Sequence, residues 1–135
     1  MMRTTRIKHL VVTGLALILL AVAPSAPSQV GLERKILTRQ DLSIPGYETV
    51  LVEVTIAVGG REGRHSHPGT LVGYILEGEL TIESDGQPTK TIKAGESVLI
   101  EPGREHEGIN KGTRPVKALV TFILEKGKPL SIPAP

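Results

Sequence analysis

The chain has 135 residues, of which 39% are hydrophobic and 22% charged, and its formal net charge is +2. This length is typical of a single domain. The absence of cysteine excludes disulfides, thiolate metal sites and cysteine catalysis, so that any bound metal must take nitrogen or oxygen ligands. The aromatic residues are only Tyr47, Tyr74 and Phe122, too few for a base-stacking platform, and we expect no nucleic-acid partner.

Residues 1–28 have the layout of a secretory signal peptide. Arg3, Arg6 and Lys8 precede an uncharged run from Leu10 to Val22, and small residues and prolines follow. The run is shorter than the roughly 20 residues that a membrane-spanning helix needs. We expect cleavage after Ser28, which gives a periplasmic or secreted product with no membrane partner. An uncleaved N-terminal anchor is the alternative.

Removal of residues 1–28 changes the sign of the net charge. Three of the 16 basic residues lie within it and all 14 acidic residues lie after it, so the remainder carries a net charge of −1. The high isoelectric point of the whole chain, about 9.0, therefore does not indicate a nucleic-acid surface.

The rest of the chain is predicted to be all-β. An edge strand is expected in the segment ERKILTR, within an N-terminal arm of residues 29–46. From Tyr47 to Val58 apolar residues alternate with period 2, and Val50, Val52, Val54, Ile56 and Val58 form one face. Further strands are predicted at 71–76, 79–83, 90–93, 97–100, 106–110 and 116–124.

Turn residues separate these segments, and Asp85-Gly86 is a hairpin signal. No amphipathic helix is predicted. Many short strands punctuated by Gly and Pro indicate a sandwich or a barrel. The Pro-rich tail, residues 127–135, is expected to lie over its surface.

Three of the four histidines lie after the leader. His65 and His67 are two residues apart, so their rings point to the same face if the segment is extended. His106 begins a later predicted strand. Three imidazoles on one side of a barrel suit a divalent first-row metal, and the sequence does not distinguish Fe, Ni, Mn, Cu and Zn. The alternative is three polar surface histidines near strand ends.

Two motifs resemble those of the cupin superfamily. The pattern G-x5-H-x-H, from Gly59 to His67 and continuing to Gly78, resembles the first, and G-x5-E-x-G-x2-H-x3-N, from Gly95 to Asn110, resembles the second. The resemblance implies a single jelly-roll barrel of antiparallel strands over residues 47–126, with a metal deep in the barrel mouth. It also implies a small-molecule ligand or substrate and a fold that is often a homodimer.

The chain departs from the family pattern at Leu71. The first motif normally places a glutamate ligand here, and the adjacent residue, Val72, is also apolar. A metal with three neutral ligands keeps positions open for water, substrate or another carboxylate, and the spacing selects none of the nearby glutamates, Glu62, Glu77, Glu79, Glu101 and Glu107. Glu107 is expected to face outward, because it follows His106 in its strand. Asn110 is expected in a turn or in the second shell of His106.

Three functions follow from these observations. The first is an exported cupin that binds a metal through His65, His67 and His106 and binds or transforms a small organic molecule. The second, more specific, is a dioxygenase that binds substrate and O₂ at the open positions. The third is a metal-free module that binds a sugar or another metabolite, which the apolar residue at position 71 would suit. The sequence leaves open whether the protein is an enzyme.

Overall fold

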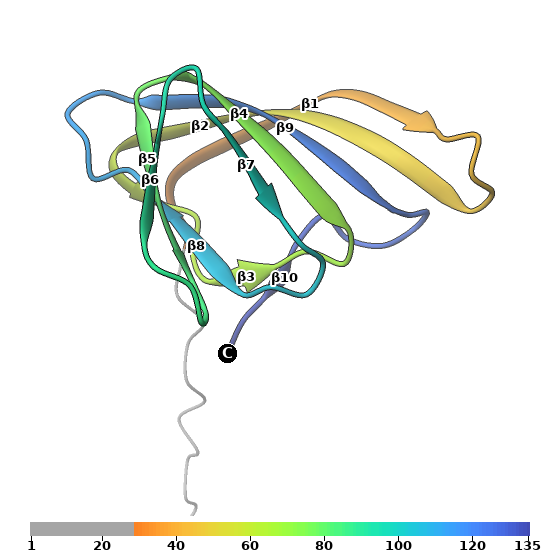
Figure 1. The fold of residues 1–135 in the computed structure, drawn as a ribbon. Coiled ribbons are helices and arrows are strands. Elements are labelled where there is room, and N and C mark those ends of the chain that lie inside the picture. Colours follow the sequence, from red (N-terminus) through yellow and green to blue (C-terminus); the bar gives the residue numbers. More distant parts are fainter. Residues whose placement is uncertain (1–28) are drawn as a thin grey trace, which may run out of the picture.

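The computed structural model describes residues 29–135, which form ten antiparallel strands and no helix (Figure 1). The strands are β1 (Val30–Asp41), β2 (Tyr47–Arg61), β3 (His65–Ser66), β4 (Thr70–Glu77), β5 (Glu79–Ser84), β6 (Lys90–Lys93), β7 (Ser97–Ile100), β8 (His106–Ile109), β9 (Val116–Glu125) and β10 (Ile132–Pro133). This all-β barrel confirms the predicted fold class. The expected signal peptide lies outside the described residues. Residues 29–135 contain no helix that is long and apolar enough to cross a membrane.

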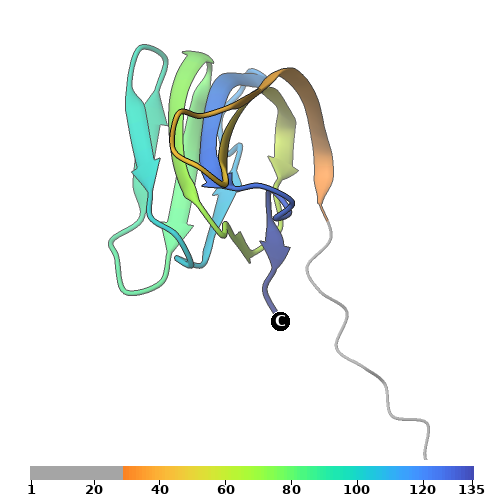
Figure 2. The same cartoon turned by 90° about the vertical axis from the view of Figure 1, so that its right-hand side faces the viewer.

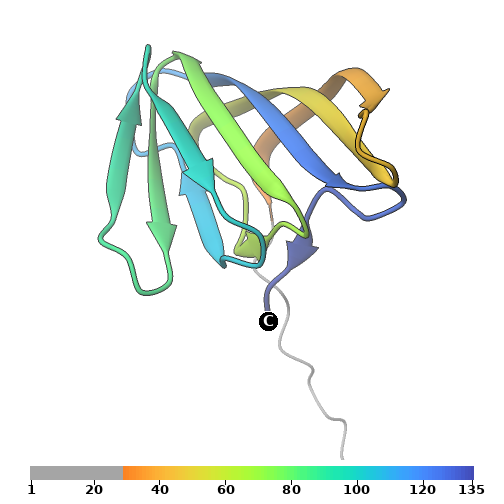
Figure 3. The same ribbon diagram turned by 45° about the vertical axis from the view of Figure 1, so that its right-hand side comes forward.

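The strands form two curved layers. One layer runs in the order β1-β2-β9-β4-β7, and β4, β9 and β2 lie side by side within it (Figure 3). The other runs β6-β5-β8-β3-β10. Pairing of Arg61 in β2 with Ile109 in β8 joins the layers on one side. On the other side β6 and β7 are not paired, so the barrel has an open seam there.

The predicted alternation of β2 builds much of the core. Val50, Val52, Val54 and Ile56 are buried and face the interior, where they meet apolar residues of β9 and β4. The prediction is wrong for Val58, which is 55% exposed. The pairing of β2 with β9 ends at Ile56, and the pairing with β1 shifts register beyond that residue. Val58 therefore lies past the end of the regular ladder.

The outer strands differ in what they contribute. β1 pairs only with β2, and all but one of its residues are exposed, so it is an edge strand at the margin of its layer (Figure 2). β3 and β10 have two residues each and were not predicted as strands. β10 pairs with β3, which brings Pro133 opposite His65, and the following Ala134 is buried. The Pro-rich tail thus reaches the segment that carries the first two histidines.

Candidate metal centre

The structure brings the three predicted histidines together. His65 in β3 and His106 in β8 are directly paired, and His67 follows β3 by one residue. Their ring centroids are 4.4 to 5.0 Å apart, and one ring nitrogen from each lies within 4.8 Å of the other two. All three side chains are buried, with exposures of 2 to 4%. The cluster is therefore an interior group that could hold a metal ion, and the surface alternative is wrong.

Backbone carbonyls orient all three rings through one nitrogen. The Nδ1 atoms hydrogen-bond to the carbonyl oxygens of Gly63 (2.7 Å from His65), Leu130 (2.6 Å from His67) and Arg104 (3.0 Å from His106). A neutral imidazole that donates from Nδ1 keeps an unprotonated Nε2 with a free lone pair. Metal-binding histidines are commonly held in this way, because the second hydrogen bond fixes both tautomer and ring direction.

Burial favours the neutral form of two of the three imidazoles, and one ring nitrogen lacks a hydrogen-bond partner. Burial lowers the pKa of His67 to about 3, and burial also lowers the pKa of His106. Nε2 of His67 is buried and has no hydrogen-bond partner among residues 29–135. An unpartnered buried polar atom costs free energy, which a bound metal ion would recover. Three neutral nitrogen donors fit a divalent first-row metal.

The side of the cluster toward β4 and β9 is apolar. Leu71 is 8% exposed, belongs to the apolar core and is paired with Phe122. The ring of Phe122 in turn meets the ring of His67 edge-on, with centroids 5.1 Å apart. The position at which the family pattern has a glutamate therefore carries a buried aliphatic side chain in the barrel wall.

Four of the five glutamates that are near the histidines in sequence are exposed, or are paired with an arginine. Glu77 and Glu79 are exposed, and Glu101 forms an ion pair with Arg104. Glu107 lies on the face of β8 opposite His106, as expected, but it is not exposed. It accepts two hydrogen bonds of 2.6 Å from the guanidinium of Arg61, which also lowers the pKa of Glu107.

Glu62 differs from these four. It is half-buried and its carboxylate lies against Gly108, two residues after His106. Sequence spacing gave no reason to select it, because its position depends on a glycine in another strand.

Asn110 directly follows β8 and begins the loop that leads to β9. It is fully buried, and its Nδ2 donates to the carbonyl oxygens of Ile56, Ala57 and Arg114 at 2.9 to 3.1 Å. Its Oδ1 accepts a hydrogen bond from the backbone N–H of Gly112. These bonds tie the end of β2 to the loop between β8 and β9, and none of them involves His106.

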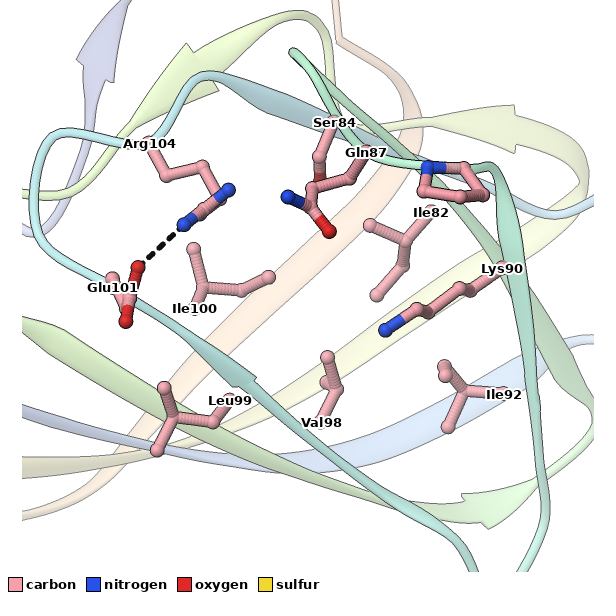
Figure 4. A pocket seen from close by; sticks show the side chains of 11 residues that line it. Ile82, Ser84, Gln87, Lys90, Ile92, Val98, Leu99, Ile100, Glu101 and Arg104 are labelled. Atoms are coloured by element: carbon pink, nitrogen blue, oxygen red, sulfur yellow. Dashed lines mark hydrogen bonds and ion pairs between the residues drawn. The ribbon is translucent and has the colours of Figure 1, made fainter.

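A cavity of about 210 Å³ lies along the open seam, between β5–β6 and β7 (Figure 4). Ile82, Ile92 and Ile100 are buried residues of its apolar wall. Ser84 also lines it and is the direct pairing partner of His106, so the two side chains point to the same face of the sheet. Ser84 thus links the wall of the cavity to the strand that carries His106, whereas none of the three histidines lines the cavity itself.

Charged groups lie at the rim of this cavity. The side chain of Lys90 points into it in Figure 4 and forms no ion pair with any residue of 29–135. At the other end the guanidinium of Arg104 is paired with Glu101 at 2.5 Å. The cavity therefore combines an apolar wall with one unpaired cation.

Comparison with known proteins places these features in a family. Residues 52–122 match the family model described as "Cupin domain". No curated protein sequence matches the chain.

Solved structures share the fold. A conserved protein with a double-stranded β-helix domain from Klebsiella pneumoniae has a TM-score of 0.62 at 21% identity, with 84% of this chain and 90% of that chain covered. A cupin-like protein from Thermotoga maritima has a TM-score of 0.63 at 20% identity, covering 82% and 84%. An oxalate oxidase in complex with the substrate analogue glycolate has a TM-score of 0.56 at 24% identity, covering 71% and 55%.

Proposed function

Because the chain belongs to the cupin domain family, we propose that it binds a divalent transition metal ion through His65, His67 and His106 and binds or transforms a small organic molecule beside that ion. The observation that carries this proposal is the orientation of the three rings. Each Nδ1 is engaged by a backbone carbonyl, and Nε2 of His67 is buried without a partner among residues 29–135. Such an arrangement presents lone pairs to a common point.

The metal would supply Lewis acidity and, if it is redox-active, a place for O₂ next to the substrate. The dioxygenase hypothesis depends on open positions around the ion, and the aliphatic side chain of Leu71 supports it, because no carboxylate fills that side. The chain's own part is to orient three imidazoles and to keep water away from their apolar flank, where Phe122 covers His67.

The cavity along the open seam suggests the kind of molecule. Its isoleucine-lined wall suits an apolar body, and the unpaired ammonium of Lys90 suits an anionic group such as a carboxylate. Ser84 connects this space to His106 through strand pairing. An acid of small size would therefore fit, in line with the glycolate named for the structurally similar oxalate oxidase.

The metal-free binding module remains the second candidate, since the apolar position 71 favours it. In that case Lys90 and the cavity would act without the ion. Export to the periplasm or the outside is proposed from the sequence of residues 1–28, and a homodimer from the family resemblance.

The deciding experiment is metal analysis of protein purified without chelator and then incubated with each of Fe, Ni, Mn, Cu and Zn. We expect about one equivalent of metal per chain, retained on gel filtration. Oxygen uptake with small carboxylic acids then tests the dioxygenase hypothesis. A protein that retains none of the five metals favours the metal-free module.

A further inference from the structure

Glu62 directs a carboxylate into the barrel. It follows directly after β2, and its backbone N–H donates to the carbonyl oxygen of Gly108 at 2.9 Å. A Cβ atom built at position 108 would lie 2.9 Å from Cδ of Glu62 and closer still to its Oε2. The missing side chain at position 108 is therefore what makes room for the carboxylate of Glu62.

This carboxylate lies on the histidine side of β8. Residues two apart in a strand point to the same face, so Gly108 shares the inward face of His106. Gly108 is also paired with Ile82, a core residue. The preceding residue, Arg61, points the other way and pairs with Glu107 on the outer face.

The carboxylate of Glu62 has no hydrogen bond or ion pair with any side chain of residues 29–135. A partly buried carboxylate without a partner is available to interact with a nearby cation. Gly108 lies two residues from His106 in the same strand, so the carboxylate that lies against Gly108 is near the histidine cluster.

We propose that Glu62 is the acidic group of the metal centre and balances the charge of the ion from the β8 side of the barrel. This rests on the proposed function. Position 71 provides no carboxylate, and three neutral imidazoles leave the charge of the ion uncompensated. The ligand atoms that lie within 4.8 Å of one another all belong to the three histidines. Glu62 would therefore act on the ion from outside this set of three nitrogens.

The test compares metal affinity in wild type, Glu62→Gln, Gly108→Ala and the double variant, with an exposed glutamate variant, Glu125→Gln, as the matched control. Competition titration with one metal and a chromophoric chelator gives the dissociation constants without any activity assay. Circular dichroism of the metal-free proteins checks the fold. Attraction between partly buried charges is only partly offset by their desolvation. We therefore expect Glu62→Gln to bind about ten- to a hundredfold more weakly.

Gly108→Ala keeps every carboxylate but displaces that of Glu62, so it should weaken binding in the same way. The double variant should be no weaker than Glu62→Gln, because both changes remove one interaction. The loss should persist at 0.5 M salt, unlike a surface effect.

Each of the remaining outcomes has a definite meaning. Wild-type affinity in Glu62→Gln, or in Gly108→Ala, overturns the role of Glu62 while the three-histidine site stands. Additive losses in the double variant also overturn it, because they separate Gly108 from Glu62. A wild-type chain that binds none of the metals overturns the proposed function itself, so the two failures are distinguishable.

Discussion

Nδ1 of His67 lies 2.6 Å from the carbonyl oxygen of Leu130, 63 residues further along the chain. The neighbouring β10 pairs with β3, where Pro133 lies opposite His65. The backbone N–H of Ala134 also donates to the carbonyl oxygen of Arg64. The C-terminal segment is therefore part of the support of two of the three imidazoles.

Deleting residues 129–135 should weaken metal binding about ten- to a hundredfold, the usual cost of losing a partner that orients a ligand. The core made by β2, β4 and β9 should stay folded, because the deletion removes one buried residue, Ala134, and one partly buried residue packed against the core, Leu130. Titration with metal and a competing chelator measures the loss. Removal of Pro135 alone is the control and should change nothing. Equal affinities for all three proteins would mean that Leu130 does not orient His67.

His106→Ala should abolish stoichiometric metal binding, since it removes one of the three imidazoles that cluster within residues 29–135. The metal should also cease to raise the melting temperature, because a ligand of the folded state stabilises by about 2.7 kcal/mol at a hundredfold excess over its dissociation constant. Elemental analysis and thermal melts with and without metal measure both effects, with Glu125→Gln as the control. Metal content equal to that of wild type contradicts the site.

Leu71→Glu should tighten metal binding if Leu71 faces the ion. A carboxylate at contact distance gains a few kcal/mol at an effective dielectric of about 20, and its burial takes back much of that. The expected net gain is roughly 1–3 kcal/mol, about one to two decades in affinity. The metal-free form should be destabilised, because Leu71 is a core residue.

The control is Leu71→Gln, whose side chain has nearly the shape of glutamate but no charge. It should bind metal no better than wild type. Any O₂-dependent activity should fall in Leu71→Glu, because an open position is filled. If the glutamate variant binds no tighter than the glutamine variant, Leu71 points away from the ion.

The metal-free protein should lose stability on acidification. Burial lowers the pKa of His67 to about 3, whereas an unperturbed histidine titrates near 6.5. Between these values the unfolded chain binds a proton that the folded chain does not. The free energy of unfolding therefore rises with pH across this window and falls as the pH drops from 6.5 toward 3.

Urea denaturation of chelator-treated protein should show a loss of about 2 kcal/mol between pH 7 and pH 5 from His67 alone, at about 1.4 kcal/mol per pH unit. The lowered pKa of His106 acts in the same direction. His67→Leu has no such group, so its stability should depend less on pH. Parallel curves for the two proteins would contradict the buried neutral imidazole.

Asn110→Ala should destabilise the fold by about 2–4 kcal/mol, because it removes the buried hydrogen bonds that this side chain makes to three carbonyl oxygens and one backbone N–H. Metal affinity of the folded fraction should change little, since Asn110 does not contact His106 by any of these bonds. Denaturation and metal titration of the same sample separate the two effects. A large loss of affinity with unchanged stability would assign Asn110 to the metal centre.

Much of the fold and of the histidine cluster could be predicted because the signals are local. Period-2 alternation marks the buried face of β2, Asp85-Gly86 marks the turn between β5 and β6, and the spacing of His65 and His67 puts both rings on one side. His106 could be joined to them through the second motif. These features need only a few neighbouring residues to be recognised.

The remaining features depend on segments that are distant in sequence. Nothing near Glu62 indicates that it turns inward, because the space it occupies is left by Gly108 in another strand. Likewise, nothing in the Pro-rich tail indicates that a carbonyl of Leu130 serves His67. The exposure of Val58 follows from where the β2–β9 pairing ends, which is also set by a distant strand.

The bond from His67 to Leu130 also sets an order of events during synthesis. At about 5–20 residues per second, the 63 residues between the two take roughly 3–13 s to add. Until then the ring of His67 has neither its acceptor nor a fixed tautomer, although His65 already has Gly63 close behind it in the chain. The hydrogen-bonded support of the three imidazoles is therefore complete only after the ribosome has made almost all of the barrel. If the cluster binds a metal as proposed, an ion that meets the nascent chain finds a site whose support is still incomplete.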